Sequence, residues 1–389
     1  MPSFGAQMRA AREARGLSLA GLAELLPADK GHLSRIENGH RRPGEDLARR
    51  VDEVLGTRGE LITCAALDVS AALDARPWET AELLHRMRAN DTSPATIETL
   101  QATVTELCCQ YGWRDARELR AEGQGWIREV VRLLHRPTGL RQHQELLVCA
   151  GWLALLVGCV EYDLGMRAGA EATRTAARQL GDEAGHTGIT GWSWEMAAWF
   201  ALTQSRHGAV LAASRAGQRA AGRQGVTVQL IAQEAKALAR LGDAPAVREA
   251  LDRGLQLLDA LPAPDRPDNH FEVDPDKWLF YAMDAYRLAG DDALAEHYAT
   301  EVIRTGTSPN GVERSPMRVA EARLTLAATA VRSGDLERAV DSGLAAFTAA
   351  RRSLPSLLLV AGEVDAELHR RYPREHATQD FREALNALR

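Results

Sequence analysis

The chain has 389 residues, of which 45% are hydrophobic and 26% are charged, a composition that excludes wholesale disorder. The length exceeds that of one ordinary domain, so we expect two or three domains. The longest uncharged apolar run, residues 146–160, is shorter than the roughly 20 residues that cross a bilayer, so we expect a buried helix over this run and no membrane partner. The N-terminus lacks the apolar core of a signal peptide, so we expect a cytoplasmic protein.

Charge and cysteines restrict the possible partners. Residues 1–50 carry nine Lys or Arg and six Asp or Glu, a net charge of +3, whereas the whole chain carries −6, so residues 51–389 carry −9. A basic segment joined to an acidic one favours a nucleic-acid-binding domain followed by a domain with another partner. The five cysteines show no Cys-x-x-Cys spacing, so we expect reduced, buried thiols and neither a disulfide framework nor a zinc site. The eleven histidines show no metal-ligand spacing either, and we expect no metal and no cofactor.

Signals for two short helices open the chain. Apolar residues at helical spacing begin at Phe4, and Gly16 ends the run. Ser18 can then cap a second helix, which we expect over 19–26 because Pro27 forbids its continuation.

A tight turn leads to the third helix. Asp29 can cap this helix, which we expect over 30–37 with Leu33 and Ile36 facing inward. A further amphipathic helix is expected over 45–55. Two short helices joined by a tight turn, the second with a polar outer face, predict a helix-turn-helix.

Residues 4–60 resemble the lambda-repressor-like, or XRE-type, DNA-binding domain. The resemblance is carried by three segments that fall in register, namely Leu22-Ala23, Leu33-Ser34-Arg35-Ile36-Glu37-Asn38-Gly39 and Pro43. It implies that the third helix enters the major groove of double-stranded DNA, and that an ion pair between Arg12 and Glu37 joins the first helix to the third. The family often has a phosphate-binding glutamine where this chain has Leu19, so the backbone N–H groups behind Ser18 are expected to hold phosphate instead.

Eight residues are our candidates for DNA contacts: Ser18, Lys30, Gly31, His32, Ser34, Arg35, Arg41 and Arg42. The resemblance places Lys30, Gly31 and Arg35 where base edges are read, although Gly31 has no side chain. Arg35 can pair bidentately with guanine, while His32 and Ser34 can donate to a base or a phosphate. Arg41 and Arg42 are expected to contact the DNA backbone without sequence preference. The alternatives are a bundle whose third helix is merely solvated, and a domain that has lost DNA binding.

The sequence predicts three regions: a helix-turn-helix domain over 1–66, a linker over 67–92, and a helical body over 93–389. The linker is rich in alanine and closes with a turn cluster, Asn90-Asp91-Thr92-Ser93-Pro94. Beyond it, apolar residues recur at helical spacing and strand signals are nearly absent, so the expected fold class is all-α.

The body shows an internal repeat. Five anchor residues each end one helical run and open a turn: Gly165, Ser205, Gly242, Gly290 and Gly334. At seven residues before, five after and twelve after these anchors, eleven of fifteen positions are Gly or Ala, which lets antiparallel helices approach closely. The pattern resembles the tetratricopeptide repeat and implies an α-solenoid, irregular because the anchor spacings of 37 to 48 exceed the usual ~34 residues. Residues 95–145 and 352–389 are expected to add a first pair and a closing cap.

The combination resembles actinobacterial XRE-family regulators with a C-terminal tetratricopeptide array and, more distantly, the peptide-sensing regulators of Gram-positive bacteria. This resemblance implies that the concave face of the array binds an effector and that the array forms a homodimer. Peptide sensors use asparagines on the inner helices, and none of the five asparagines here falls on an expected inner helix. The effector is therefore expected to be a small apolar or aromatic molecule or a protein before a peptide.

Helical offsets from the anchors predict the inner row of the array: Trp152, Leu155, Cys159, Tyr162, Trp192, Glu195, Trp199, Leu202, Gln229, Ala232, Lys236, Ala239, Lys277, Phe280, Asp284, Arg287, Glu321, Leu324, Ala328 and Val331. Aromatic residues with a few charges suit a small-molecule pocket. The candidate effector residues are Trp152, Tyr162, Trp192, Trp199, Lys236, Asp284 and Arg287. The alternative is that the tryptophans are core residues between repeats.

Motifs for catalysis are missing from the sequence. It contains no Gly-Lys dipeptide, and hence no phosphate-binding P-loop, and none of the common hydrolase, zinc-protease or dinucleotide motifs. We therefore expect a non-enzyme: a dimeric, sequence-specific transcriptional regulator whose repeat domain senses an effector or a partner. The alternative is an interaction scaffold with a vestigial DNA-binding head.

Overall fold

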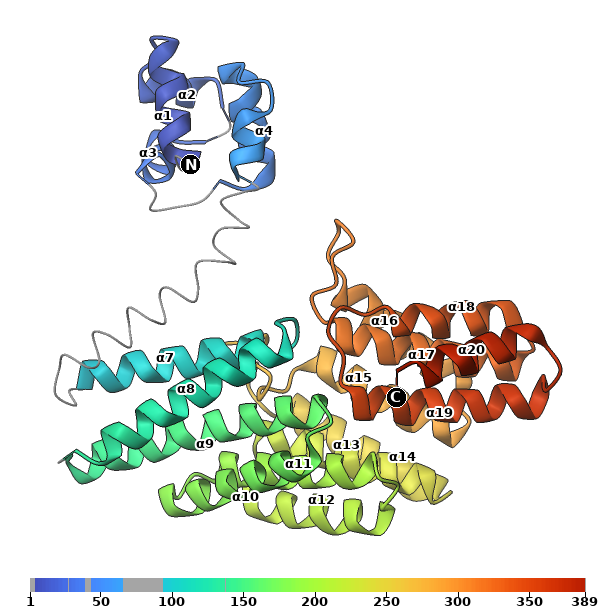
Figure 1. Cartoon of the computed structure of the whole chain (residues 1–389). Coiled ribbons are helices and arrows are strands. Elements are labelled where there is room, and N and C mark those ends of the chain that lie inside the picture. Colours follow the sequence, from blue (N-terminus) through green and yellow to red (C-terminus); the bar gives the residue numbers. More distant parts are fainter. Residues whose placement is uncertain (1–3, 27, 39–42, 66–93, 137, 389) are drawn as a thin grey trace. The chain divides into compact units, whose positions relative to one another are not determined.

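The computed structural model describes residues 4–26, 28–38, 43–65, 94–136 and 138–388 (Figure 1). The chain divides into two compact units, Met1–Asp91 and Thr92–Arg389. The described residues form helices and loops; no strand occurs among them, and one isolated antiparallel bridge joins Thr307 to Glu313. The all-α prediction is confirmed. The expected linker over 67–92 lies outside the described residues, as do Arg41 and Arg42.

The N-terminal unit contains α1 (Phe4–Ala14), α2 (Leu19–Glu24), α3 (Lys30–Glu37) and α4 (Glu45–Leu55). A further helical segment runs over 60–65. One core joins these helices, with Met8, Leu22, Leu33, Ile36, Val51 and Leu61 at its centre. Helix α2 is two residues shorter than expected, because the residue before Pro27 disfavours the helical conformation and the last turn opens at Leu25.

The described part of the body consists of seven helix pairs. Their helices are α7 (Pro94–Gln110), α8 (Ala116–Leu134), α9 (Leu140–Asp163), α10 (Arg167–Ala184), α11 (Thr187–Leu202), α12 (His207–Ala221), α13 (Gly225–Arg240), α14 (Ala244–Asp259), α15 (Pro275–Ala289), α16 (Asp292–Gly306), α17 (Pro316–Ser333), α18 (Leu336–Phe347), α19 (Leu354–Arg371) and α20 (His376–Asn386). The expected helical-repeat body is confirmed.

Each repeat turns at its anchor residue. All five anchors have a left-handed backbone, with φ of +76° at Gly165, +55° at Ser205, +79° at Gly242, +81° at Gly290 and +92° at Gly334. Glycine adopts this conformation without strain, so the turns select it at four of the five positions. The fifteen offset positions are all buried. At Gly217 an added Cβ would lie 2.7 Å from Leu230 Cδ1, so the small residue permits the approach of α12 to α13.

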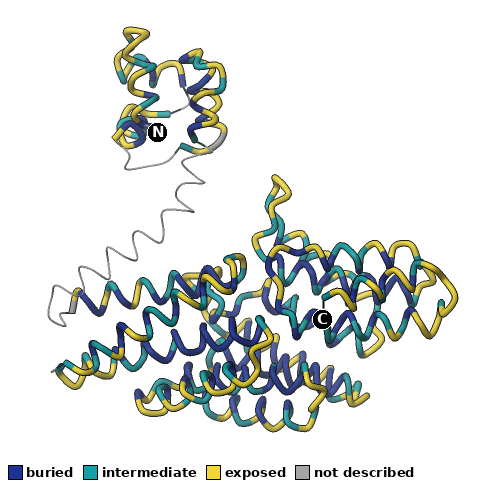
Figure 2. Tube along the Cα trace, viewed as in Figure 1, coloured by how far each residue is buried: buried dark blue, intermediate teal, exposed yellow. Residues whose placement is uncertain are grey.

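The first helices of successive pairs contact one another in the order α7, α9, α11, α13, α15, α17, α19. The row returns on itself, because α19 also contacts α9. These inner helices carry most of the buried positions, drawn dark blue in Figure 2. Helix α9 alone among the described helices is long and apolar enough to cross a membrane, but 78% of its apolar window is buried inside the body, as in the core helix of a soluble protein.

Candidate nucleic-acid interface and effector site

Helix α3 is held against α1 by a close backbone approach and by an ion pair. An added Cβ on Gly5 would lie 2.3 Å from the carbonyl oxygen of Ile36, so glycine is required where the two helices meet. Glu37, at the end of α3, accepts from Arg12 Nε at 2.6 Å and from Arg9 Nε at 3.3 Å. The hydrogen bond to Glu37 raises the pKa of Arg12 above its usual value. The ion pair expected between Arg12 and Glu37 is therefore present.

Capping side chains begin both α2 and α3. Ser18 Oγ accepts from the backbone N–H of Gly21 at 3.0 Å, and Asp29 Oδ1 accepts from that of His32 at 2.9 Å. The hydrogen bond from His32 lowers the pKa of Asp29. A Cβ on Gly31 would lie 3.1 Å from Asp29 Oδ1, so the missing side chain at this candidate DNA-contact position leaves room for the cap.

The outer face of α3 carries basic and polar side chains. Lys30 and Arg35 are exposed, and His32 and Ser34 are half-buried. Arg35 Nε donates to the carbonyl of Gly31 at 3.2 Å, which lays the guanidinium along the helix. Within the described residues, no carboxylate lies at ion-pair distance from Lys30 or Arg35. Beside α3 is an open groove of about 450 Å³, lined by Ala28, Asp29, His32, Asp46, Leu47 and Arg50.

In the body, the predicted aromatic residues pack against other parts of the same chain. The ring of Phe271, from the loop between α14 and α15, lies 5.3 Å from that of Trp152 and 5.2 Å from that of Trp192. Tyr162 stacks on Phe200 at 3.8 Å, and Trp199 Nε1 donates to Ser356 Oγ of α19 at 2.9 Å. These contacts match the alternative that the tryptophans are core residues between repeats.

The predicted charged residues form a buried ion-pair cluster. Asp284 of α15 pairs with Arg287, with Arg240 at 3.0 Å and with Lys236 at 3.8 Å. Burial alone would raise the pKa of Asp284, but the three neighbouring cations have the larger effect and hold this pKa well below its usual range. Glu363 of α19 accepts from Arg287 at 2.6 Å.

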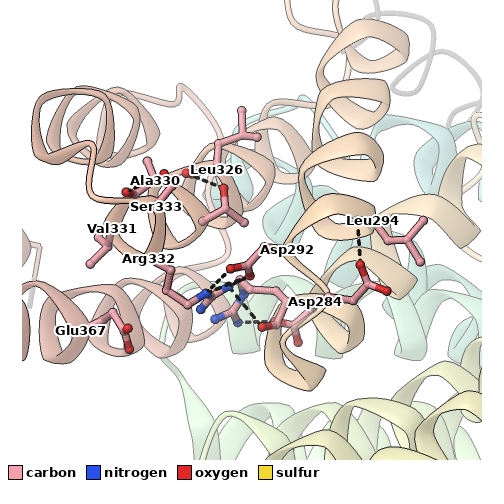
Figure 3. A network of polar contacts seen from close by, with 12 residues as sticks. Asp284, Asp292, Leu294, Leu326, Ala330, Val331, Arg332, Ser333 and Glu367 are labelled. Carbon is pink, nitrogen blue, oxygen red and sulfur yellow. Dashed lines mark hydrogen bonds and ion pairs between the residues drawn. The ribbon is translucent and has the colours of Figure 1, made fainter.

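The cluster continues along the inner helices. The backbone carbonyl of Arg287 accepts from Arg332 at 3.2 Å, and Arg332 Nε also pairs with Asp292 at 2.8 Å. Figure 3 shows this second pair beside Asp284. Lys236 and Arg287 are thus already matched to carboxylates of the chain.

Sequence reasoning missed the residues that cover the inner row. They are His270 and Phe271 in the α14–α15 loop, and Arg351, Ser356 and Glu363 near and in α19. Arg351 pairs with the buried Asp163 of α9 at 2.7 Å, across 188 residues of sequence. No local pattern signals such distant contacts. All five cysteines are free and buried, and the described residues contain no group of three His, Cys, Asp or Glu side chains placed to hold a metal.

One comparison with known proteins identifies the N-terminal unit. A family model described as a helix-turn-helix domain matches residues 3–63, so this unit is a helix-turn-helix domain. No curated protein matches the chain. A crystal structure of Bacillus thuringiensis PlcR in complex with the peptide PapR7 and DNA is similar over 95% of this chain and 99% of that one, with 13% identity and a TM-score of 0.30. Neither value is high enough for that complex to say what this chain binds.

Proposed function

We propose that the protein is a sequence-specific DNA-binding transcriptional regulator, acting inside the cell as a homodimer, with a tetratricopeptide-like body that senses an effector or a partner. The head supplies recognition of double-stranded DNA through α3. Lys30 and Arg35 contact base edges, Ser34 and His32 a base or phosphate, and the N–H groups capped by Ser18 a phosphate. Arg41 and Arg42 supply affinity without sequence choice.

The observation that carries this proposal is that some basic side chains of the helix-turn-helix unit are paired with carboxylates and others are not. Arg9 and Arg12 are matched to the buried carboxylate of Glu37, whereas Lys30 and Arg35 extend from α3 with no carboxylate of the described chain at ion-pair distance. Two cations without an ion-pair partner on one face of a well-capped helix are not expected in a scaffold whose N-terminal unit has lost DNA binding. Phosphates and guanine edges are the natural partners of that face.

The proposal is tested by selecting sites from a random DNA library and then measuring affinity over a range of salt concentrations. Arg35→Ala should cost about 1–3 kcal/mol and relax one base position, whereas Arg41→Ala should weaken all sequences alike and flatten the salt dependence. Arg141→Ala, which removes an exposed charge from the body, is the matched control and should leave binding unchanged. A library that yields no preferred sequence would favour the scaffold function instead.

The dimer has its own test. A single short recognition helix contacts too little DNA to be specific alone, so we expect pseudo-palindromic sites with half-sites about 10 base pairs apart. Footprints on single, unpaired half-sites would contradict the dimer. Sedimentation of the full chain should report two copies.

The body is proposed to bind the effector on the inner row at Trp152, Tyr162, Trp192, Trp199, Lys236, Asp284 and Arg287. The effector is a small molecule, a protein or a peptide. Because these side chains already contact residues of the chain, an effector has to compete with the chain's own contacts. A differential affinity of about 1.4 kcal/mol between two shapes of the body changes DNA occupancy tenfold.

A further inference from the structure

The loop between α14 and α15 inserts into the inner row at its aromatic end. Phe271 places its ring between those of Trp152 and Trp192, and the ring of His270 packs against that of Tyr111 at a tilt of 35°, with 3.8 Å between ring centroids. The backbone N–H of His270 donates to the carbonyl of Cys108 at 3.2 Å. The loop therefore joins the fourth pair of the body to α7 and the turn that follows it.

Several hydrogen bonds and an ion pair lie within the loop itself. The side chain of Asn269 accepts from the N–H of Phe271 at 2.9 Å, and the backbone N–H of Asn269 donates to the carbonyl of Arg266 at 2.9 Å. Arg266 pairs with Asp268 at 2.9 Å. These internal bonds would survive if the loop moved out as a unit, so leaving the site costs the ring contacts, the bond to Cys108, the contacts of Arg266 with α7 and the hydrogen bonds from Lys277.

A buried ammonium group holds the loop in place. Lys277 of α15 is fully buried, and its Nζ donates to the backbone carbonyls of Asn269 and His270 at 2.8 Å each, and to that of Glu272. Lys236 and Arg287 face Asp284, but no carboxylate of the described residues lies at ion-pair distance from Lys277. Burial lowers the pKa of Lys277 well below its usual value, and neutral carbonyls are weaker partners for a cation than a carboxylate, so an anion beside Nζ would stabilise the charged form.

The loop also contacts the part of the body that is next to the head in sequence. Besides the bond to Cys108, Arg266 donates to Cys109 Sγ at 3.0 Å and pairs with Glu106 at 3.4 Å. These residues lie at the end of α7, the first described helix after the helix-turn-helix unit. Removal of the loop therefore changes the support of α7.

We propose that the loop over 266–273 is a displaceable occupant of a binding site for a small aromatic acid. The ligand's ring replaces Phe271 between Trp152 and Trp192, its carboxylate replaces the carbonyls at Lys277, and the end of α7 is released. The ring and the carbonyl of Glu272 belong to adjacent residues, so a ligand whose ring and carboxylate are a few atoms apart spans both sites. This inference rests on the proposed function only in taking the body as a sensor.

Hydrogen exchange on the full chain tests the proposal, with phenylacetate as the probe and the neutral phenylacetamide as its control. Phe271→Ala should speed exchange at the end of α7 about tenfold while leaving α17 to α20 unchanged. Phe381→Ala, which deletes an equally buried phenylalanine from α20, is the matched control and should spare α7. Phe271→Leu keeps an apolar side chain in the slot and serves if the alanine variant does not fold.

In the wild-type chain, phenylacetate should speed exchange at residues 106–111 and quench the fluorescence of Trp152 and Trp192, at concentrations about tenfold below those of phenylacetamide. Uniform loss of protection in Phe271→Ala would mean that the loop is only core. Equal effects of acid and amide, or no effect of phenylacetate, would overturn the assigned ligand class. Neither readout uses DNA, so failure here is distinct from failure to find a DNA site.

Discussion

Replacing Glu37 with Leu tests whether the ion pair at the end of α3 holds this helix, the proposed recognition helix, in place. The Glu37 side chain is 4% exposed and that of Arg12 is 11% exposed. Removing one partner of a buried pair costs about 3–5 kcal/mol, because the remaining charge is uncompensated. Arg12 would still donate a hydrogen bond to the carbonyl of Leu17 at 2.8 Å, so we expect Glu37→Leu to lower the free energy of unfolding by somewhat less, about 2–3 kcal/mol.

The loss is measured by hydrogen exchange at the amides of α3 in the full chain, where it should reduce protection roughly 30- to 150-fold. Glu13→Leu is the matched control, since Glu13 also contacts Arg12 at 3.3 Å but is 62% exposed. That control should change stability by less than about 0.5 kcal/mol. Arg12→Met combined with Glu37→Leu should recover most of the lost stability, because the double variant removes both charges and leaves neither one buried without a partner.

Equal protection in Glu37→Leu and Glu13→Leu would refute the reasoning. It would mean that Arg12 reaches water when its partner is removed, and that the backbone contact at Gly5 alone positions α3.

Three further changes probe other contacts. Gly5→Ala places a Cβ 2.3 Å from the carbonyl of Ile36, so we expect the head to lose about 1–3 kcal/mol, seen as faster exchange in α1 and α3 only. Burial raises the pKa of Asp52, but hydrogen bonds from Thr57, Gly59 and Leu61 lower it more, so the net effect is a lowered pKa. The stability of the N-terminal unit should therefore fall as the pH drops below about 4, and Asp52→Asn should flatten that dependence in acid unfolding. Arg351→Met leaves Asp163 buried without its cation and should cost the body about 3–5 kcal/mol in urea unfolding, whereas the exposed Arg370→Met should cost little.

Local chemistry was sufficient to predict the helices α1 to α4 of the N-terminal unit, although α2 ends two residues early. Caps, glycines and apolar spacing predicted α3 and α4 to the residue and the start of α1, because each of these signals acts within one or two turns of its own helix. The left-handed anchors of the body were predictable for the same reason: a turn that requires positive φ selects glycine.

The contacts that fill the inner row were not predictable in this way. Helical offsets place Trp192 and Arg287 on inner helices, but they carry no information about what covers those side chains. Phe271 and Glu363 come from a loop and a helix that are distant in sequence, and nothing in their own neighbourhoods marks them as partners. The aromatic and charged composition that suggested an open pocket is equally that of a buried, internally matched core.

The contact between Arg351 and Asp163 can form only late in the synthesis of the chain. The two residues are 188 positions apart, and a ribosome adding roughly 5–20 residues per second needs about 10–40 s to make the chain between them. Throughout that interval the nascent body is a string of stacked pairs whose Asp163 has no cation and whose Trp199 lacks the hydroxyl of Ser356. A chain truncated before residue 351 is thus left with a buried carboxylate on α9 and an indole N–H on α11 that lack the partners they have in the complete body.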